Sequence, residues 1–360
     1  MACYLTVKPS ASALSPGVFR LLALVAAATV ALVSPVGSAT ANAPFKVCAT
    51  CTYTDIPSAL VAAAAQSGDD TIQVAPGSYP EPITVSTNVK LLGAGSGQTT
   101  IGELDVSAGV SVTINGVTIH GVGFGGPGES GITNAGVLTL KSSVVSDNQT
   151  LAGAGILNLS TGSATVQDST VTGNSAFLAS GGGILNAGTM TLQHSTVSNN
   201  GTFGAGGGIF NQGALTLQAS TVSDNGAFGI GGGIANAGAL TLQDSTVSDN
   251  VSCCAGPVGG GGIYNGATGT TTLRNSTVTG NSAFLLARDG GGIFNDGALT
   301  LRDSTVSGNS AIGRGGGIYN SSTGTGTLTN STVIDNTAPV GPGIFNDGGT
   351  MTIKDSRVQP

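Results

Sequence analysis

A short phrase, Leu-Thr-Leu-x-x-Ser-Thr-Val in its most regular form, recurs nine times between Leu138 and Val358. In every copy a Thr stands four residues before the Ser, and a Val stands two residues after it. The serines of successive copies lie 25 to 31 residues apart. A repeat of this length predicts a solenoid in which each copy forms one coil and stacks on the next. The nine serines are Ser143, Ser169, Ser195, Ser220, Ser245, Ser276, Ser304, Ser331 and Ser356.

Two other signatures accompany the phrase in most coils, Gly-Ile-x-Asn and Val-x-x-Asn. Three short β segments per coil are therefore expected, separated by bends that are rich in Gly and Asn, which accept the left-handed conformations of sharp corners. Stacked Asn side chains of neighbouring coils can hydrogen-bond along the solenoid axis. The Asn of the first signature is Asn134, Asn158, Asn186, Asn211, Asn236, Asn265, Asn295, Asn320 and Asn346, and that of the second is Asn148, Asn174, Asn200, Asn225, Asn250, Asn281, Asn309 and Asn336.

Alternation along the phrase assigns the faces of the β segments. In Leu-Thr-Leu the leucines point to one side and the Thr to the other, and in Ser-Thr-Val the Ser and Val share one side. The Leu, Val and Ile columns then form the core, and the Thr columns face solvent. Only 8% of the residues are charged, so Thr, Ser and Asn must supply most of the polar surface. We expect an all-β solenoid of roughly eleven coils, none of them stable alone.

Residues 1–43 have the pattern of a secretory signal peptide. Arg20 precedes the apolar run 21–33, and the small residues Ala41-Asn42-Ala43 suit cleavage after Ala43. The alternative is a buried helix or a retained anchor. This segment carries two basic residues and no acidic one, so the remainder has nine basic and 18 acidic residues. That balance disfavours nucleic acid and anionic membranes as partners. A secreted or cell-surface protein with no membrane span after cleavage is expected.

Four cysteines follow the predicted leader. In an exported protein, Cys48 and Cys51 are expected to form a local disulfide, and the alternatives are a redox pair or half of a zinc site. A bond between the adjacent Cys253 and Cys254 would be strained, so their pairing stays open.

The residues between the leader and the first coils predict an N-terminal cap at 44–70, ahead of the solenoid at 71–360. Asp55 is a good helix N-cap, and the segment from Asp55 to Gln66 is helical in composition. Its apolar residues, Ile56, Leu60, Val61 and Ala64, are expected to cover the first coil. No comparable cap is evident at the C-terminal end. Either Lys354, Arg357 and Pro360 protect that end or a second chain does, which would make an oligomer.

These features resemble the right-handed parallel β-helix, or pectate-lyase-like, superfamily. The segments Asp55–Tyr79 and Val89–Gly95 look like the capping helix and first coils of such proteins. The Gly-Gly-Gly-Ile-x-Asn and Val-x-x-Asn units are similar to the repeats of bacterial polymorphic-outer-membrane-protein-like β-helices. The resemblance spans about residues 48–358 and implies the fold. It implies no single function, because lyases, hydrolases, esterases and adhesins share the scaffold.

A lyase or glycoside hydrolase on this scaffold would need stacked carboxylates for Ca²⁺ and an Arg or Lys base. In that interpretation Arg288 or Arg314 is the base, and Asp249 and Asp289 bind Ca²⁺, the only cofactor expected. The alternative is that repeat columns stack any Asp and that the loop arginines are solvated. The aspartate pair, Gly-His-Gly and Arg-x-Lys pattern of polygalacturonases does not occur. Enzymatic activity is therefore not the favoured interpretation.

The variable residue of Gly-Ile-x-Asn is aromatic in four consecutive coils, as Tyr264, Phe294, Tyr319 and Phe345. With the Ile inward, these rings are expected to point outward as a ladder that binds a glycan or a surface protein. The alternative is that loops of adjacent coils fold over them. A third hypothesis is ice binding through the Thr columns, although Thr is also a common residue of exposed strands. The favoured function is a secreted or cell-surface binding or adhesion scaffold.

Overall fold

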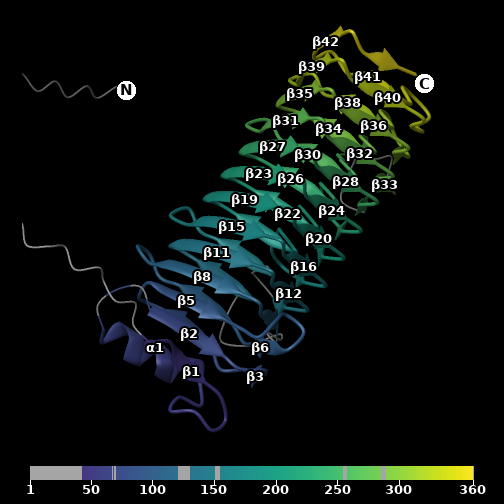
Figure 1. Cartoon of the computed structure of the whole chain (residues 1–360). Helices are drawn as coiled ribbons and strands as arrows, with labels where there is room; N and C mark the ends of the chain where they lie inside the picture. Colours follow the sequence, from purple (N-terminus) through teal and green to yellow (C-terminus); the bar gives the residue numbers. More distant parts are fainter. Residues whose placement is uncertain are drawn as a thin grey trace, which may run out of the picture. The chain divides into compact units, whose positions relative to one another are not determined.

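The computed structural model describes residues 43–66, 68, 70–120, 130–150, 155–253, 258–284 and 289–359. The predicted leader lies outside these residues except for its last position, and so do Cys254 and Arg288. Ala41–Pro360 form one compact unit. Within it, coils follow one another from purple to yellow in Figure 1, and every strand pairs in parallel with the equivalent strand of the next coil. The predicted all-β solenoid is confirmed, and the eleven strands of one of its sheets mark about eleven turns.

Sheet 1 is built mainly from the Leu-Thr-Leu segments, whose central Thr alternates with two inward apolar residues. In the pairing of β23 with β27, Leu215 lies beside Leu240 and Thr216 beside Thr241. The strands of this sheet are β1 (Phe45–Val47), β2 (Asp70–Val74), β5 (Val89–Leu92), β8 (Ser111–Asn115), β11 (Val137–Lys141), β15 (Ser163–Gln167), β19 (Thr189–Gln193), β23 (Ala214–Gln218), β27 (Ala239–Gln243), β31 (Thr270–Arg274), β35 (Ala298–Arg302), β39 (Thr325–Thr329) and β42 (Thr350–Lys354).

Sheet 2 follows sheet 1 across a sharp corner and consists largely of the Thr-Val-Ser or Thr-Val-Thr segments. The corner residue before the Ser of each repeat has a left-handed backbone, as at Asp168 with φ 49° and Asn275 with φ 47°. The strands of this sheet are β3 (Gly77–Tyr79), β6 (Thr99–Ile101), β9 (Thr118–His120), β12 (Val144–Ser146), β16 (Thr170–Thr172), β20 (Thr196–Ser198), β24 (Thr221–Ser223), β28 (Thr246–Ser248), β32 (Thr277–Thr279), β36 (Thr305–Ser307), β40 (Thr332–Ile334) and β43 (Arg357–Val358).

Sheet 3 is built mainly from the Ile-x-Asn segments. Each of its Ile residues from Ile132 to Ile318 is fully buried. The strands of this sheet are β4 (Ile83–Val85), β7 (Leu104–Val106), β10 (Ile132–Asn134), β14 (Ile156–Asn158), β18 (Ile184–Asn186), β22 (Ile209–Asn211), β26 (Ile234–Asn236), β30 (Ile263–Asn265), β34 (Ile293–Asn295), β38 (Ile318–Asn320) and β41 (Ile344–Asn346).

Sheet 4 is a fourth set of strands that the three predicted β segments per coil did not include. It begins directly after the Asn of Val-x-x-Asn, where two or three residues, most of them small or apolar, continue the pairing between coils. The strands of this sheet are β13 (Gln149–Thr150), β17 (Ser175–Ala176), β21 (Gly201–Thr202), β25 (Gly226–Ala227), β29 (Val251–Cys253), β33 (Ser282–Phe284) and β37 (Ser310–Ala311).

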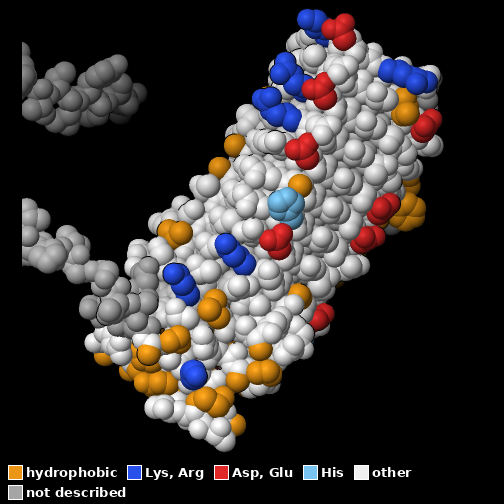
Figure 2. Space-filling model, viewed as in Figure 1, with side chains coloured by type: hydrophobic (Ala, Val, Ile, Leu, Met, Phe, Trp, Pro, Cys, Tyr) orange, Lys and Arg blue, Asp and Glu red, His pale blue; other side chains and the backbone are white. Residues whose placement is uncertain are grey.

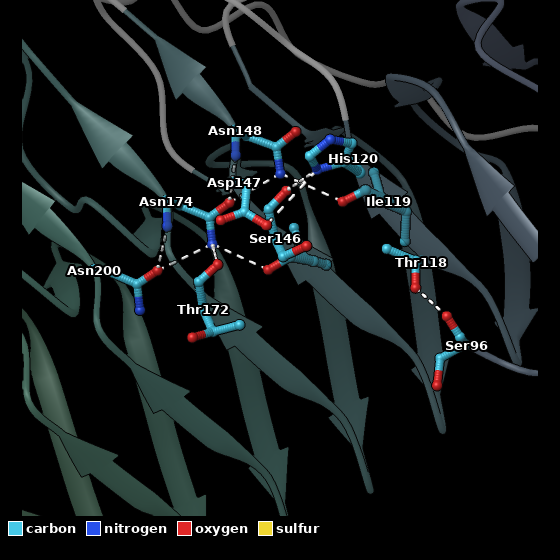
Figure 3. A network of polar contacts seen from close by, with 11 residues as sticks. Ser96, Thr118, Ile119, His120, Ser146, Asp147, Asn148, Thr172, Asn174 and Asn200 are labelled. Atoms are coloured by element: carbon cyan, nitrogen blue, oxygen red, sulfur yellow. Dashed lines mark hydrogen bonds and ion pairs between the residues drawn. The ribbon is translucent and has the colours of Figure 1, made fainter. Parts of the chain in front are cut away.

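Both Asn columns form the predicted hydrogen-bonded ladders. In the sheet 3 ladder the amide Nδ2 of each Asn donates to Oδ1 of the next over 2.7 to 2.9 Å. In the ladder before sheet 4 the corresponding distances are 2.9 to 3.0 Å. Figure 3 shows Asn148, Asn174 and Asn200 in one line across three coils. These buried amides are satisfied by each other and by backbone carbonyls, so the polar corners are compatible with a buried interior.

The N-terminal cap is a helix, α1 (Ile56–Ala64), that packs against β1, β2 and β4. Asp55 caps it as predicted, because its Oδ1 accepts from the backbone N–H of Ser58 at 2.7 Å. The predicted apolar face is wrong in two positions, since Val61 and Ala64 are exposed. The buried residues, Ile56, Ala59, Leu60 and Ala63, follow the i, i+3, i+4, i+7 spacing of a helix face.

Cys48 and Cys51 form the predicted disulfide, with the Sγ atoms 2.09 Å apart, beside this cap. At the other end, β42 pairs with β39 only, and Ile353 and Val358 are exposed. The proposed association through this end stays a prediction. Among the described residues, no helix has the length and apolar character that crossing a bilayer requires.

Candidate binding surfaces

The aromatic column predicted from Gly-Ile-x-Asn exists and its rings stack. Tyr264, Phe294, Tyr319 and Phe345 occupy equivalent positions in β30, β34, β38 and β41. Their ring centroids lie 5.5, 4.7 and 5.7 Å apart in that order. We call these four residues the tyrosine column.

The tyrosine column is less exposed than the sequence predicts. Phe294 is 5% exposed and Tyr319 is 4% exposed, and only Tyr264 and Phe345 at the two ends are half-buried. A glycine with a left-handed backbone precedes each strand and folds back against the aromatic residue. A Cβ on Gly315 would lie 2.8 Å from Tyr319 Cα. The backbone of each glycine bend therefore packs closely against the backbone of the aromatic residue that follows it. Residues 254–257 and 285–288 of the long loops lie outside the described residues, so the alternative that loops cover the column stays a prediction.

Arg314 covers the end of the tyrosine column. Its Cζ lies 4.9 Å from the ring centroid of Tyr319 and 4.8 Å from that of Phe345. Its Nη2 donates to Asp289 Oδ2 at 2.9 Å and to Tyr319 Oη at 3.1 Å. Its Nη1 donates to Asp347 Oδ2 at 3.2 Å. One guanidinium thus connects three successive coils, and we call this group the Arg314 cluster.

Hydrogen bonds and burial within the Arg314 cluster shift the pKa values of Tyr319, Asp347 and Arg314. Burial and the hydrogen bond to Asp347 raise the pKa of Tyr319. The hydroxyl of Tyr319 donates to Asp347 Oδ2 at 2.5 Å, and this bond lowers the pKa of Asp347, with Arg314 acting in the same direction. The hydrogen bond with Asp289 raises the pKa of Arg314. At neutral pH the cluster is a charged Arg between two carboxylates, beside a neutral phenol.

The residues predicted for a lyase site lie in different surroundings. Arg314 is already bonded to Asp289 and Asp347, and its raised pKa takes it away from the neutral form that a base needs. Asp249 is exposed at the left-handed corner between β28 and β29, with φ 56°. Asp289 has a buried carboxylate that accepts from Arg314. Within the described parts of the chain, no three His, Cys, Asp or Glu side chains gather as a metal site would require.

A second aromatic column was missed in the sequence. Phe177, Phe203 and Phe228 follow β17, β21 and β25, with ring centroids 4.7 and 5.1 Å apart. Their exposed fractions are 42%, 54% and 46%. A sequence signal existed, because each stands three residues after the Asn of Val-x-x-Asn. We call these three residues the phenylalanine column.

The exposed apolar surface continues past the phenylalanine column. Cys253 and Phe284 follow in the next coils, since they are paired between β29 and β33. Phe284 is half exposed, and Ile312 after β37 is exposed as well. The inward neighbours in this sheet are small, among them Ala176, Ala227, Ala283 and Ala311. Aliphatic and aromatic bulk at this corner is therefore turned outward, toward solvent.

A groove of about 310 Å³ lies along the phenylalanine column. The residues that line it are Ser175, Gly201, Thr202, Phe203, Gly226, Ala227, Phe228, Val251 and Cys253. Two rings therefore stand beside a strip of small residues.

Hydroxyl groups cover much of the remaining surface. Sheet 2 places two outward hydroxyl columns side by side, as in Thr170 and Thr172 or Thr277 and Thr279, and Figure 2 shows a face on which most side chains are neither charged nor hydrophobic. The sequence also has Thr-x-Thr pairs, the arrangement favoured for ice binding, at 189/191 and 350/352, and these lie on sheet 1. Ice binding stays a prediction.

A comparison of sequences agrees with the fold of the coils. Residues 104–278 match a family model described as the right handed beta helix region. The described coils have the fold of a right-handed parallel β-helix. No curated protein sequence matches this β-helix.

Several solved structures are similar to the β-helix at low identity. A pectin methylesterase from Aspergillus niger is 13% identical over 88% of this chain and 86% of that chain, with a TM-score of 0.33. The A-module of the mannuronan C-5 epimerase AlgE4 from Azotobacter vinelandii is 13% identical over 84% and 91%, with a TM-score of 0.44. PfbA, a surface adhesin of Streptococcus pneumoniae, is 12% identical over 84% and 88%, with a TM-score of 0.35. The similarity to each of them concerns the fold alone.

Proposed function

We propose that this β-helix is a secreted or cell-surface binding scaffold whose extracellular partner contacts the phenylalanine column. The observation that carries the proposal is the exposure of three stacked rings, between 42% and 54%, on a regular and rigid framework. Contiguous exposed apolar surface is uncommon on soluble proteins and marks interaction sites. Aromatic rings on a rigid support bind at a small cost in conformational entropy.

The Cys48–Cys51 disulfide supports an extracellular location, because disulfides persist in oxidising compartments. The predicted leader at 1–43 is consistent with that location and stays a prediction. The binding surface proposed here is a different column from the one predicted from the sequence. Phe294 and Tyr319 are covered, so of the tyrosine column only Tyr264 and Phe345 retain a partly accessible ring.

The alternative function, a polysaccharide lyase or glycoside hydrolase, is favoured by no comparable observation in the described residues. Of its two proposed bases, Arg314 is bonded to two carboxylates and Arg288 lies outside the described residues. Its proposed cation ligands Asp249 and Asp289 lie in different surroundings. The assay that distinguishes the alternatives is release of unsaturated or reducing ends from neutral and acidic polysaccharides, with and without Ca²⁺.

The binding proposal is tested with the chain from Pro44 onward on an array of extracellular glycans and on whole-cell surfaces. We expect Phe203→Ser combined with Phe228→Ser to reduce binding by about tenfold or more, because exposed aromatic anchors dominate such surfaces. The matched control is Tyr264→Ala combined with Phe345→Ala, at the accessible ends of the other column. Unchanged binding in the first variant and lost binding in the control would contradict the proposal and support the tyrosine column.

A further inference from the structure

The outer side of sheet 4 carries two residue columns next to each other. In each coil a floor residue points outward from the strand, and a wall residue two positions later stands in the ridge that contains the phenylalanine column. The groove lies over the floor residues of the two coils of β21 and β25. From β17 to β33 the floor residues are Ser175, Gly201, Gly226, Val251 and Ser282, and the wall residues are Phe177, Phe203, Phe228, Cys253 and Phe284.

The fold does not require the two glycines of the floor. A Cβ on Gly226 would meet nothing within 4 Å, and one on Gly201 would have its nearest neighbour at 3.9 Å. Neither backbone is left-handed, so local strain requires glycine at neither position. Glycine in a strand without such a need is found where another backbone or a ligand approaches closely.

The size of the groove matches the ridge beside it. The groove has a volume of about 310 Å³. A protein cavity of about 150 Å³ holds one benzene ring, so this groove has room for about two phenyl groups. The ridge over the same two coils consists of two stacked phenyl groups, those of Phe203 and Phe228. One surface thus carries two projecting rings and, directly beside them, a space for two rings.

The sizes of the floor and wall residues compensate each other from coil to coil. A phenylalanine of the wall accompanies a serine or glycine of the floor in the coils of β17, β21, β25 and β33. In β29 the order is reversed, because the larger Val251 is in the floor and the smaller Cys253 is in the wall. Both columns point outward, so this compensation does not serve packing within one copy. It is expected if the wall residues of a second copy lie on the floor residues of the same coils.

A two-fold axis parallel to the solenoid axis produces that arrangement. The rotation reverses the lateral order of the two columns and keeps the order of the coils, so the wall of each copy faces the floor of the other. Phe203 then lies on Gly201 of the second copy and Phe228 lies on Gly226. The same contacts recur in the opposite direction, as an isologous interface requires. A two-fold axis perpendicular to the solenoid would place ridge against ridge and leave the groove empty.

The charges beside the groove favour the same arrangement. None of its nine lining residues is charged. Asp224 and Asp249 are exposed at the corners that lead into β25 and β29, on the side of the floor away from the rings. In the parallel pair the carboxylates of the two copies lie at opposite rims, with both ring columns between them. In the antiparallel pair they would lie along the same rim, where like charges repel.

The exposed rings supply enough surface for a weak and specific contact. Phe177, Phe203, Phe228 and Phe284 are each 42–54% exposed. An aromatic side chain buries about 150–250 Å², so the four rings bring on the order of 400 Å² of each copy into contact. With the floor residues included, the pair buries on the order of 1,000 Å², near the lower limit of specific interfaces, and we expect a dissociation constant of about 1–100 μM. At lower concentrations the chain is monomeric and the phenylalanine column is open to solvent.

We infer that the partner of the phenylalanine column is a second copy of this chain, which lies parallel to the first and seats its rings on the floor residues of the same coils. This inference rests on the proposed function of the column as a contact surface and adds the identity and the direction of the partner.

The experiment separates the rings from the floor. Analytical ultracentrifugation measures the association of the chain from residue 44 onward and of two complementary variants. The ring variant, Phe203→Ser with Phe228→Ser, removes the rings and keeps the floor open. The floor variant, Gly201→Val with Gly226→Val, keeps the rings and fills the floor with the residue that β29 already carries. Equal melting temperatures establish that the variants fold.

We expect each variant alone to associate at least about tenfold more weakly than the wild type. An equimolar mixture of the two variants should associate more tightly than either variant alone, because the rings of the floor variant can occupy the open floor of the ring variant. The matched control, Gly97→Val, should associate like the wild type, because an added Cβ there also meets nothing within 4 Å and the backbone is not left-handed. Asp224→Asn with Asp249→Asn should change the dissociation constant by less than about threefold, since the carboxylates lie at opposite rims.

Undiminished association of the floor variant, or no gain on mixing, would overturn the inference. Association about tenfold tighter in the variant with both Asp224→Asn and Asp249→Asn would overturn it as well, because the carboxylates would then lie along one rim. If the wild type stays monomeric up to about 1 mM and the ring variant loses surface binding, the proposed function stands, another ligand occupies the column, and the inference alone fails. If the wild type associates as expected and the ring variant keeps its surface binding, the inference stands and the proposed function fails.

Discussion

The two aromatic columns have the same origin and opposite environments. In both, one aromatic residue per coil stacks on its neighbour at 4.7 to 5.7 Å between ring centroids. In the tyrosine column the middle rings are almost fully buried, and in the phenylalanine column the middle ring is 54% exposed. The solenoid register therefore produces stacking, and what lies beside the rings decides exposure. Glycine-rich bends and Arg314 lie beside the tyrosine column, and an open groove lies beside the other.

The largest expected difference between the columns is in stability. Phe294→Ala should lower the free energy of unfolding by about 3–5 kcal/mol, because it leaves a cavity between two stacked rings. Phe203→Ala occupies the equivalent middle place of the exposed column and should cost about 1 kcal/mol or less. Urea unfolding followed by circular dichroism measures both. Similar losses in the two variants would mean that the phenylalanine column is structural too.

The Arg314 cluster should account for the next largest effect. Arg314→Met removes the partner of the buried Asp289 carboxylate, and breaking a buried ion pair in this way costs about 3–5 kcal/mol. Because the Arg314 side chain is 38% exposed, solvent screening reduces our expectation to about 2–3 kcal/mol. The matched control is Arg302→Met on the exposed face of β35, for which we expect a change within about 0.5 kcal/mol in urea. An equally small loss of stability in both variants would show that the Arg314 cluster does not stabilise the stacking of the coils.

Alkaline pH should reduce the stabilising contribution of the tyrosine column and leave that of the phenylalanine column unchanged. The folded-state pKa of Tyr319 is raised, so its contribution is complete below the unfolded-state pKa of about 10 and is lost as the pH rises through the folded-state value. The urea midpoint should therefore fall above about pH 10. Tyr319→Phe should flatten that fall. A fall of the same size in Tyr319→Phe would assign the pH dependence to other groups.

Added Ca²⁺ should have the smallest effect on stability, because the two carboxylates predicted to bind it lie beside different aromatic columns. Asp249 lies at the corner that leads to the exposed column, and Asp289 is bonded to Arg314 beside the tyrosine column. We expect the melting temperature to be unchanged by millimolar Ca²⁺. A rise that Asp249→Asn or Asp289→Asn abolishes would restore the metal site predicted from the sequence, and with it the lyase alternative.

The fold could be predicted because the residue types that form each column recur at fixed positions in the repeats of the sequence. Nine copies of the phrase with an invariant Thr and Val determine the inward and outward faces, and the Asn ladders follow from Asn at fixed positions. The short strands of sheet 4 escaped prediction because they contain two or three residues of little pattern, such as Gly201–Thr202. Their pairing depends on the Asn ladder beside them more than on their own propensity.

The candidate sites could be predicted only in part, because exposure depends on residues that lie far away in the sequence. The stacking of Tyr319 on Phe294 follows from the repeat, but the contacts of its ring and hydroxyl with Arg314 and Asp347 do not. The position of the phenylalanine column could have been predicted from the sequence, because each of its residues stands three places after the Asn of Val-x-x-Asn. Its exposure was not, since the same reasoning would have placed the tyrosine column in solvent.

The most direct test of the division between the two columns is hydroxyl-radical footprinting of the chain from Pro44 onward, read residue by residue with mass spectrometry. Our account predicts fast oxidation at Phe203 and Phe228 and slow oxidation at Phe294 and Tyr319. On addition of a bound glycan or cell-surface fraction, only the first pair should become protected. Fast oxidation at Phe294 and Tyr319, with protection of those residues by the partner, would contradict it.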